Sequence, residues 1–205
     1  MGKIYLIRHG ETTSNRAASF VGSTDMPLNE EGFRQAALIA DHLGGHPIAA
    51  VYSSGLMRAR QTAEVIAERF GLPVIQVPKL NELDYGEWEG IPEVEPPIRC
   101  PEFYREWRAN PLEMRPPGGE TFGELRDRAY PALMRIAEDN RDRDIVVVAH
   151  KSTNRMLLCC VMGRSVNEYK QVGQENAAIN VLNLTDDGRL TVEHVNQISH
   201  LRRVS

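Results

Sequence analysis

Two histidines stand directly after apolar, strand-like segments of the sequence. Residues 4–7 (Ile-Tyr-Leu-Ile) lead into Arg8 and His9, and residues 145–149 (Ile-Val-Val-Val-Ala) lead into His150. Short, continuous apolar runs of this kind predict buried parallel strands, and open parallel sheets bind ligands beyond the carboxyl ends of their strands. We therefore expect both histidines to face one pocket, although either one alone would more simply be a solvated loop residue.

The loop after the first segment holds groups suited to binding a phosphate dianion. Arg8 supplies a guanidinium, Gly10 permits close approach of the backbone, and Asn15 supplies an amide donor beside the nucleophile candidate His9. A second arginine, Arg58, stands at the start of a predicted helix, where the helix N-terminus adds partial positive charge. Together these groups predict recognition of a tetrahedral anion. A surface ion pair is the alternative role for Arg58.

No group of residues in the sequence has the spacing of a metal or redox site. His42 and His46 are four residues apart, but Gly44-Gly45 breaks the helix between them and no carboxylate or cysteine completes a ligand set. Cys159-Cys160 falls in an apolar helical segment and is expected in the core. We therefore expect neither a metal nor a cofactor.

Composition limits the class of protein and its partners. The chain has 205 residues, 24 Lys+Arg against 28 Asp+Glu, and a formal net charge of -4. This length predicts a single domain over residues 1–205, and the lack of a basic run argues against nucleic acid binding. No apolar run approaches the roughly 18 residues of a membrane span. With three cysteines and no disulfide pattern, we expect a cytoplasmic protein without membrane association.

The elements that position these residues alternate between strand and helix. Strands are predicted at 4–7, 48–52 and 74–77. A helix opening at Asn29 separates the first two strands, and a helix from Met57 to Phe70 separates the second and third. The first helix is expected to bury Phe33, Ala36, Ala37, Ala40 and Leu43. This alternation predicts an α/β fold, a three-layer α/β/α sandwich with a mainly parallel sheet.

The rest of the chain departs from this alternation. Seven prolines between 81 and 119 predict a lid-like excursion with one short helix near 102–108. A capping box at Thr121 predicts a helix to about Asn140 that tolerates or kinks at Pro131. A strand at 145–149, a helix at 152–162 and a closing hairpin of 178–184 and 190–198 complete the predicted elements.

Six ordered motifs resemble those of the histidine phosphatase superfamily, which has the phosphoglycerate mutase-like fold. The motifs are Arg8-His9-Gly10 with Asn15, Gly22–Leu28 leading to Gly32 and Gln35-Ala36, Ser53-Ser54 followed by Arg58 and Gln61-Thr62-Ala63, Glu82 within Asn81–Gly90, Gly118–Thr121, and His150 after its valine-rich segment. The resemblance spans nearly the whole chain. One such motif would be weak evidence, but six at compatible spacing are specific.

The resemblance implies a role for each site residue. His9 would attack phosphorus through one ring nitrogen, the other being held as a donor to the backbone, and form a phosphohistidine. The phosphate oxygens would be held without a metal by Arg8, Asn15, Arg58 and His150. Glu82 would protonate the leaving group and later deprotonate water, favoured by its apolar neighbours. The competing carboxylates are Glu11, Asp84 and Glu87.

Two positions depart from the family pattern and bear on selectivity. Lys151 follows His150 where many relatives have glycine, and Val21 stands where relatives often have a polar residue near the phosphate. The backbone amide of Lys151 is expected near the phosphate, while its side chain either reaches a second anionic group or points into solvent. The further candidates to contact a substrate carboxylate or second phosphate are Arg99, Arg105, Arg115 and His200.

The sequence thus predicts a metal-independent phosphomonoesterase acting on a small acidic phosphorylated metabolite, with phosphoserine-like or sugar-phosphate-like substrates favoured. The segments 101–107 and 196–201 are similar to those of small phosphoserine phosphatases in this superfamily. A cofactor-dependent phosphoglycerate mutase is the first alternative, disfavoured by the compact excursion. A catalytically silent phosphate-binding module is the second, disfavoured because each catalytic position holds a competent residue. A homodimer is left open.

Overall fold

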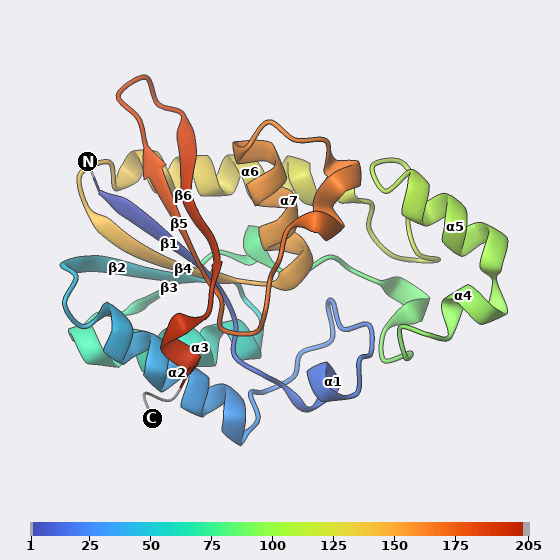
Figure 1. Ribbon diagram of the computed structural model, residues 1–205, viewed down its shortest axis with the longest axis horizontal. Helices are drawn as coiled ribbons and strands as arrows, with labels where there is room; N and C mark the ends of the chain where they lie inside the picture. Colours follow the sequence, from blue (N-terminus) through green and yellow to red (C-terminus); the bar gives the residue numbers. More distant parts are fainter. Residues whose placement is uncertain (1, 203–205) are drawn as a thin grey trace.

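The computed structural model describes residues 2–202, and a six-stranded sheet runs through its centre (Figure 1). The strands are β1 (Lys3–Arg8), β2 (Ile48–Ser53), β3 (Val74–Gln76), β4 (Asp144–Ala149), β5 (Ile179–Leu184) and β6 (Leu190–Gln197). Their spatial order is β3-β2-β4-β1-β5-β6. The first four in this order are parallel, and β5 and β6 are antiparallel to their neighbours. The predicted mainly parallel sheet and the closing hairpin are confirmed.

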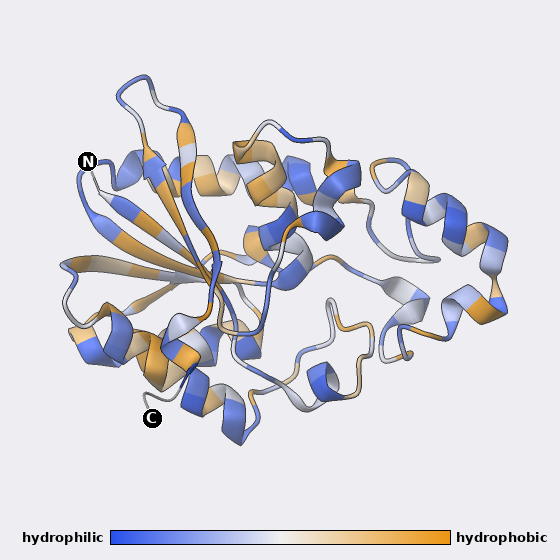
Figure 2. Cartoon of the chain, in the orientation of Figure 1, coloured by the Kyte–Doolittle hydropathy of each residue, from blue (hydrophilic) through white to orange (hydrophobic). Residues whose placement is uncertain are grey.

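Helices cover both faces of the sheet. The period of two in β1 sends Ile4 and Leu6 to one face and Tyr5 and Ile7 to the other. The helices α2 (Glu30–Leu43) and α3 (Met57–Phe70) pack on the face of Tyr5, while α6 (Phe122–Asp139) and α7 (Lys151–Val161) pack on the face of Ile4. Apolar residues accordingly gather on the strands and on the helix sides that face them (Figure 2). The three-layer α/β/α architecture is therefore confirmed.

The buried face of α2 differs from the one predicted. Phe33 is 42% exposed, Ala37 is also exposed, and the inward face instead includes Gly32 and Gln35. Gln35 Oε1 accepts a hydrogen bond from the Glu11 amide at 2.9 Å. This bond ties the start of the helix to the loop after β1, so a polar side chain takes an inward place and Phe33 turns outward.

The segment between β3 and α6 holds more helix than its prolines predicted. It contains the 3₁₀ turns η1 (Pro78–Leu80) and η2 (Gly86–Trp88) and the helices α4 (Pro96–Arg99) and α5 (Pro101–Ala109). Both α-helices begin with proline, which the first helical position accepts because its N–H has no intrahelical partner. The segment projects beyond the sheet in Figure 1. It is held by aromatic contacts, among them the edge-to-face pair of Trp88 and Trp107, whose centroids lie 5.0 Å apart.

The remaining elements are short. They are α1 (Thr13–Arg16), η3 (Val166–Gln171) and η4 (Ser199–Leu201). The capping box at Thr121 starts α6 as predicted, and Pro131 lies inside that helix. Within residues 2–202, no helix combines the length and the apolar character needed to cross a bilayer.

Candidate active site

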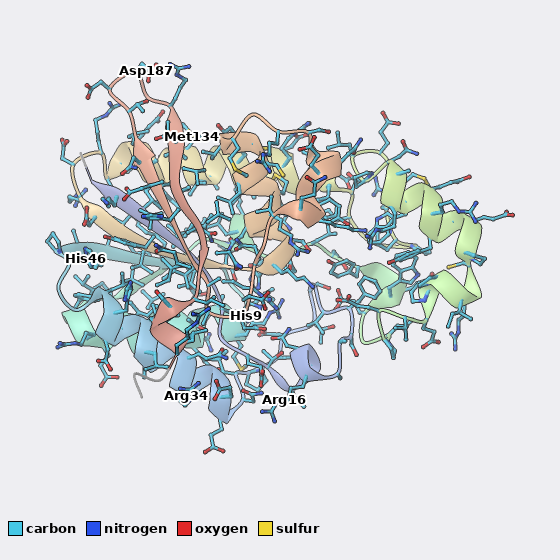
Figure 3. All side chains as sticks on the ribbon, in the orientation of Figure 1. His9, Arg16, Arg34, His46, Met134 and Asp187 are labelled. Atoms are coloured by element: carbon cyan, nitrogen blue, oxygen red, sulfur yellow. The ribbon has the colours of Figure 1, made fainter. Side chains whose placement is uncertain are left out.

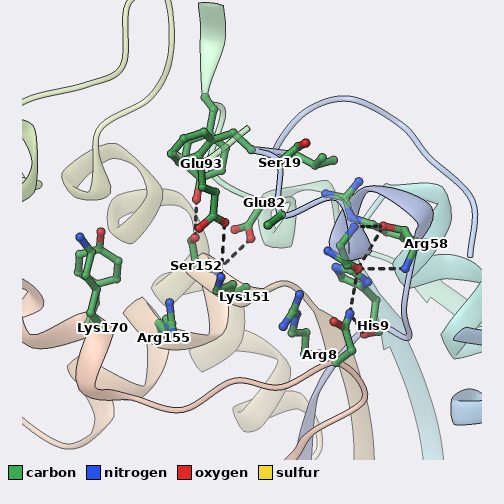
Figure 4. A pocket seen from close by; sticks show the side chains of 18 of the residues that line it. Arg8, His9, Ser19, Arg58, Glu82, Glu93, Lys151, Ser152, Arg155 and Lys170 are labelled. Atoms are coloured by element: carbon green, nitrogen blue, oxygen red, sulfur yellow. Dashed lines mark hydrogen bonds and ion pairs between the residues drawn. The ribbon is translucent and has the colours of Figure 1, made fainter. Parts of the chain in front are cut away.

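A pocket of about 260 Å³ opens beyond the carboxyl ends of β1 and β4 (Figure 4). Arg8 of β1 is the register partner of Ala149 of β4, and the His9 amide donates to the Ala149 carbonyl at 3.1 Å. The residue that follows each of these two strands is a histidine, and the ring centroids of His9 and His150 lie 5.1 Å apart. The sheet brings the two histidines together.

The ring of His9 is held in one tautomer. It is 3% exposed, and its Nδ1 lies 2.7 Å from the Gly10 carbonyl oxygen. A carbonyl only accepts, so Nδ1 carries the proton and Nε2 keeps its lone pair. Burial first, and then the charges of Arg58 and Arg8, lower the pKa of His9 well below its usual value. The imidazole is neutral at pH 7, as a nucleophile requires.

Two buried arginines lie beside this ring. The Arg8 Nη1 donates to the Gln174 carbonyl at 2.7 Å, while Arg58 donates to the carbonyls of Thr24 at 2.9 Å and Gly22 at 2.8 Å. Burial lowers the pKa of both guanidinium groups. That of Arg8 falls to about 10, so Arg8 stays charged at neutral pH. Arg8 Nε is buried without a hydrogen-bond partner among residues 2–202, which leaves a donor for an anion.

His150 is fully buried at the N-cap of α7. Its Nε2 lies 2.6 Å from Ser54 Oγ, and its Nδ1 has no partner within the described part of the chain. Burial, followed by the nearby Arg58 charge, lowers the pKa of His150 well below its usual value. Its ring packs against that of His9 at a tilt of 55°, and among the described residues it is not part of the pocket lining.

Asn15 lines the pocket with its amide oxygen already saturated. Its Oδ1 accepts from the Thr12 amide at 3.0 Å, from Thr12 Oγ1 at 3.1 Å and from Asn176 Nδ2 at 3.0 Å. Thr12 is the N-cap of α1, and the two residues form a capping box. Since the oxygen is occupied, the Asn15 Nδ2 group is the part free to donate to a ligand.

Glu82 lies in the pocket wall at the N-terminus of α7. Its Oε1 accepts from the amides of Leu83 and Thr153 at 2.9 and 3.0 Å and from Thr153 Oγ1 at 3.1 Å. Its Oε2 accepts from the Ser152 amide alone, at 2.9 Å. The sequence had indicated an apolar setting for this carboxyl group; the structure adds four donors. The less occupied Oε2 has the capacity to exchange a proton.

Of the selectivity candidates, Val21 and Lys151 line the pocket. Lys151 Nζ lies 3.7 Å from Glu93 Oε1, and burial lowers the pKa of Lys151. The other carboxylates weighed against Glu82, namely Glu11, Asp84 and Glu87, do not line the pocket.

The structure does not bring the other four selectivity candidates to this pocket. Arg99 forms an ion pair with Glu95, the N-cap of its own short helix, and Arg105 is exposed on α5. Arg115 Nη2 is paired with Glu124 Oε1 at 2.9 Å. His200 stacks on His42, with centroids 5.4 Å apart. These four side chains therefore take no part in the lining of the pocket.

Residues 4–197 match the family model of the histidine phosphatase superfamily (branch 1). The chain belongs to the histidine phosphatase superfamily. It is 37% identical over 208 residues to the metal-independent phosphoserine phosphatase of Arabidopsis thaliana, covering 98% of this chain and 84% of the relative. It is 30% identical to phosphoserine phosphatase 1 of Hydrogenobacter thermophilus, with 98% and 95% covered.

A solved structure of a histidine phosphatase relative shares the whole architecture. The crystal structure of phosphoserine phosphatase from Entamoeba histolytica in complex with 3-phosphoglyceric acid aligns with a TM-score of 0.88 at 25% identity, covering 98% of this chain and 100% of the other. The family resemblance and the phosphoglycerate mutase-like fold expected from the motifs are therefore confirmed.

The pocket of this histidine phosphatase also contains residues that the sequence analysis missed. They are the cations Arg108, Arg155 and Lys170 and the aromatics Tyr104, Trp107 and Tyr169. Arg155 had a signal, because it stands one helical turn after Lys151 and shares its face of α7. Lys170 had none, because it reaches the pocket from η3 only through long-range packing.

The two histidines weighed as a metal pair lie away from this site. His46 sits at the other end of β1 from His9 (Figure 3) and its Nδ1 lies 2.9 Å from the Tyr5 hydroxyl. Among residues 2–202, no group of three or more His, Cys, Asp or Glu side chains has a metal-binding arrangement.

Proposed function

We propose that this chain is a metal-independent phosphomonoesterase that hydrolyses a small, acidic phosphorylated metabolite through a phosphohistidine on His9. The observation that carries the proposal is the 2.7 Å contact of His9 Nδ1 with the Gly10 carbonyl, which leaves Nε2 free beside two buried arginines. The phosphoserine phosphatases among its relatives support the same reaction class.

In the first step, His9 Nε2 attacks phosphorus and the bond from phosphorus to the ester oxygen breaks. Arg8, Arg58 and the Asn15 amide hold the equatorial oxygens, and His150 packs against the ring of the nucleophile. The donors are fixed before the substrate arrives, so they stabilise the charge of the transition state without reorganising. Glu82 gives its proton to the departing alkoxide, and the free alcohol leaves.

In the second step, water attacks the phosphohistidine and the phosphorus–nitrogen bond breaks. Glu82, now a carboxylate, takes the proton of the attacking water through Oε2, the oxygen that accepts only the Ser152 amide. Inorganic phosphate leaves, His9 regains its lone pair, and Glu82 is again protonated. Atoms and charges are thereby restored, and water replaces the alcohol as the acceptor.

We also propose that the enzyme is located in the cytoplasm. The thiols Cys100, Cys159 and Cys160 are free, which suits a reducing cytoplasm. The substrate is the only partner that the reaction requires, and we favour substrates of the phosphoserine or phosphoglycerate type because cations continue beyond the phosphoryl site.

A substrate screen tests this function. Purified protein is incubated with phosphorylated amino acids, hydroxy acids and sugars, and both free phosphate and isomerised product are followed. Phosphate release that is lost in the His9→Ala variant supports the proposal. Interconversion of 2- and 3-phosphoglycerate without net phosphate release would identify a mutase, and inactivity on all substrates would leave a binding module.

A further inference from the structure

The pocket has a second end, away from the phosphoryl site. Figure 4 shows His9 and Arg58 on one side, with Lys170 and Arg155 on the other. This second end is formed by α5, α7 and η3 rather than by the strands. None of its residues has a place in the two steps above.

The ammonium end of the half-buried Lys170 lies inside the protein with no carboxylate paired to it among residues 2–202. Its Nζ has no solvent contact and no hydrogen-bond partner among residues 2–202. It lies 5.8 Å from the Trp107 ring centroid and 5.3 Å from that of Tyr169. The aromatic faces stabilise the charge but accept no conventional hydrogen bond, so the ammonium group keeps its donors for a ligand.

The indole of Trp107 adds a second free donor. The ring is 3% exposed, and its Nε1 is buried without a partner within the described chain. Native structures rarely leave such donors unpaired unless a ligand or water satisfies them. Two unpaired donors on adjacent side chains of one pocket therefore indicate an acceptor that binds there.

Arg155 makes the third contribution. Its Nε donates to the Val172 carbonyl at 2.8 Å, which fixes the guanidinium while no hydrogen bond or ion pair within residues 2–202 occupies its terminal nitrogens. Lys151 differs, because Glu93 already lies 3.7 Å from its Nζ. Arg108, the other cation at this end, is exposed and donates to the Tyr104 hydroxyl at 3.0 Å. We therefore assign the subsite to the less exposed Lys170 and Arg155.

We propose that Lys170, Trp107 and Arg155 form a carboxylate subsite that selects phosphorylated hydroxy or amino acids; this rests on the proposed phosphatase function. An ammonium, an indole N–H and a guanidinium together suit the acceptor lone pairs of one carboxylate. With phosphate at His9 and carboxylate at Lys170, the substrate spans the pocket between its two cationic ends.

Matched substrates test the subsite. O-phosphoserine and O-phosphoethanolamine differ by one carboxylate, as 3-phosphoglycerate and glycerol 3-phosphate differ by carboxylate against hydroxymethyl. In Lys170→Gln we expect KM for the carboxylate member of each pair to rise about 10- to 100-fold, because a charge-assisted hydrogen bond is lost. KM for the other member and for p-nitrophenyl phosphate should not change. Trp107→Phe, which keeps the ring and removes the N–H, should give a smaller rise. Lys79→Gln, at an exposed lysine outside the pocket, is the control.

Each result is decisive. Equal kinetics of wild type and Lys170→Gln on both pairs would overturn the subsite, and so would a rise confined to a bisphosphate substrate, which would make it a second phosphate site. If wild type releases phosphate from none of these substrates, the proposed function is contradicted instead. In that case, calorimetric titration of 3-phosphoglycerate against glycerol 3-phosphate still tests the subsite, and carboxylate-dependent binding that needs Lys170 would support it.

Discussion

The His9 and His150 rings lie 5.1 Å apart because each histidine follows one of two register partners on adjacent parallel strands. This separation is close to the spacing of neighbouring strands, about 4.8 Å. The sheet backbone, and not the packing of flexible side chains, therefore sets the distance between them. Removing one imidazole should leave the strands and the other ring in place.

His9→Ala should keep the fold and lose turnover by about 10⁴-fold or more, because only the imidazole can carry the phosphoryl group. Mass spectrometry after a rapid, acid-free quench should find a phosphate adduct on His9 of the wild type. His194→Ala, at a half-exposed histidine on β6, is the matched control and should be fully active. An active His9→Ala enzyme would contradict the mechanism.

Chelation should not affect the rate. The charges that face the phosphate in this proposal belong to Arg8 and Arg58, so dialysis against excess EDTA should leave kcat and KM unchanged within error. A metal-dependent phosphatase would lose activity and regain it with magnesium. Restoration by added magnesium would show that the anion site has been misinterpreted.

Glu82→Gln keeps the shape of the side chain but cannot supply or take the proton. Turnover should fall by about 10²–10⁴-fold for alkyl phosphates, whose leaving groups need protonation, and much less for aryl phosphates. Glu87→Gln, on the exposed side chain of η2, provides the control and should change neither. Equal losses on both substrate types would assign Glu82 a positional role.

The buried histidines should make stability fall in mild acid. Burial lowers the pKa of His9 and His150 well below 6.5 in the folded state, so the unfolded chain binds more protons below that pH. The free energy of unfolding should therefore drop as pH falls from 6.5 to 5, by up to about 1.4 kcal/mol per pH unit for each histidine. Urea denaturation at several pH values measures the slope. His9→Ala should reduce this slope by the equivalent of about one proton, whereas His194→Ala should leave it unchanged. An unchanged slope in His9→Ala would contradict the lowered pKa of His9.

Lys151 should matter less than Lys170. Because Glu93 lies 3.7 Å from Lys151 Nζ, Lys151→Ala should raise KM for carboxylate-bearing or doubly phosphorylated substrates only about 2- to 5-fold, as a partly exposed charge does. Substrates without a second anionic group should be unaffected. The Glu93→Gln/Lys151→Ala double variant should recover part of the loss, because the unbalanced carboxylate is removed. If wild type and Lys151→Ala have identical kinetics on both substrate groups, Lys151 has no role in substrate binding.

Local signals explain which elements could be predicted. The helix Met57–Phe70 was predicted with its observed bounds, since Gly71 ends it in the left-handed conformation, at φ 65°. Helix α4 was missed because proline was interpreted only as a helix breaker, while Pro96 occupies the first position of that helix. The outward turn of Phe33 could not be predicted, because it depends on the bond between Gln35 and the loop after β1.

The same contrast holds for the site. Arg8, His9 and Asn15 stand close together in the sequence, from the end of β1 to α1, and were predicted together from their types and spacing. The far end of the pocket joins Trp107 of α5 to Lys170 of η3, and no sequence spacing encodes that contact. The arginines of the segment 81–119 were predicted to contact substrate because of their charge. Arg99 instead forms an ion pair with Glu95, the N-cap of its own helix.

The aromatic contact between Trp107 and Lys170 has a consequence for engineering this enzyme. The phosphoryl-transfer groups of the proposed mechanism come from the strand ends, from the loops next to them and from the first turns of α3 and α7, whereas this contact joins two segments that contribute none of them. Mutant libraries confined to Pro101–Ala109 and Val166–Gln171 should therefore vary substrate preference while retaining the phosphoryl-transfer chemistry. Sequence changes in these two segments would change which metabolite is bound and leave the residues of the proposed mechanism unchanged.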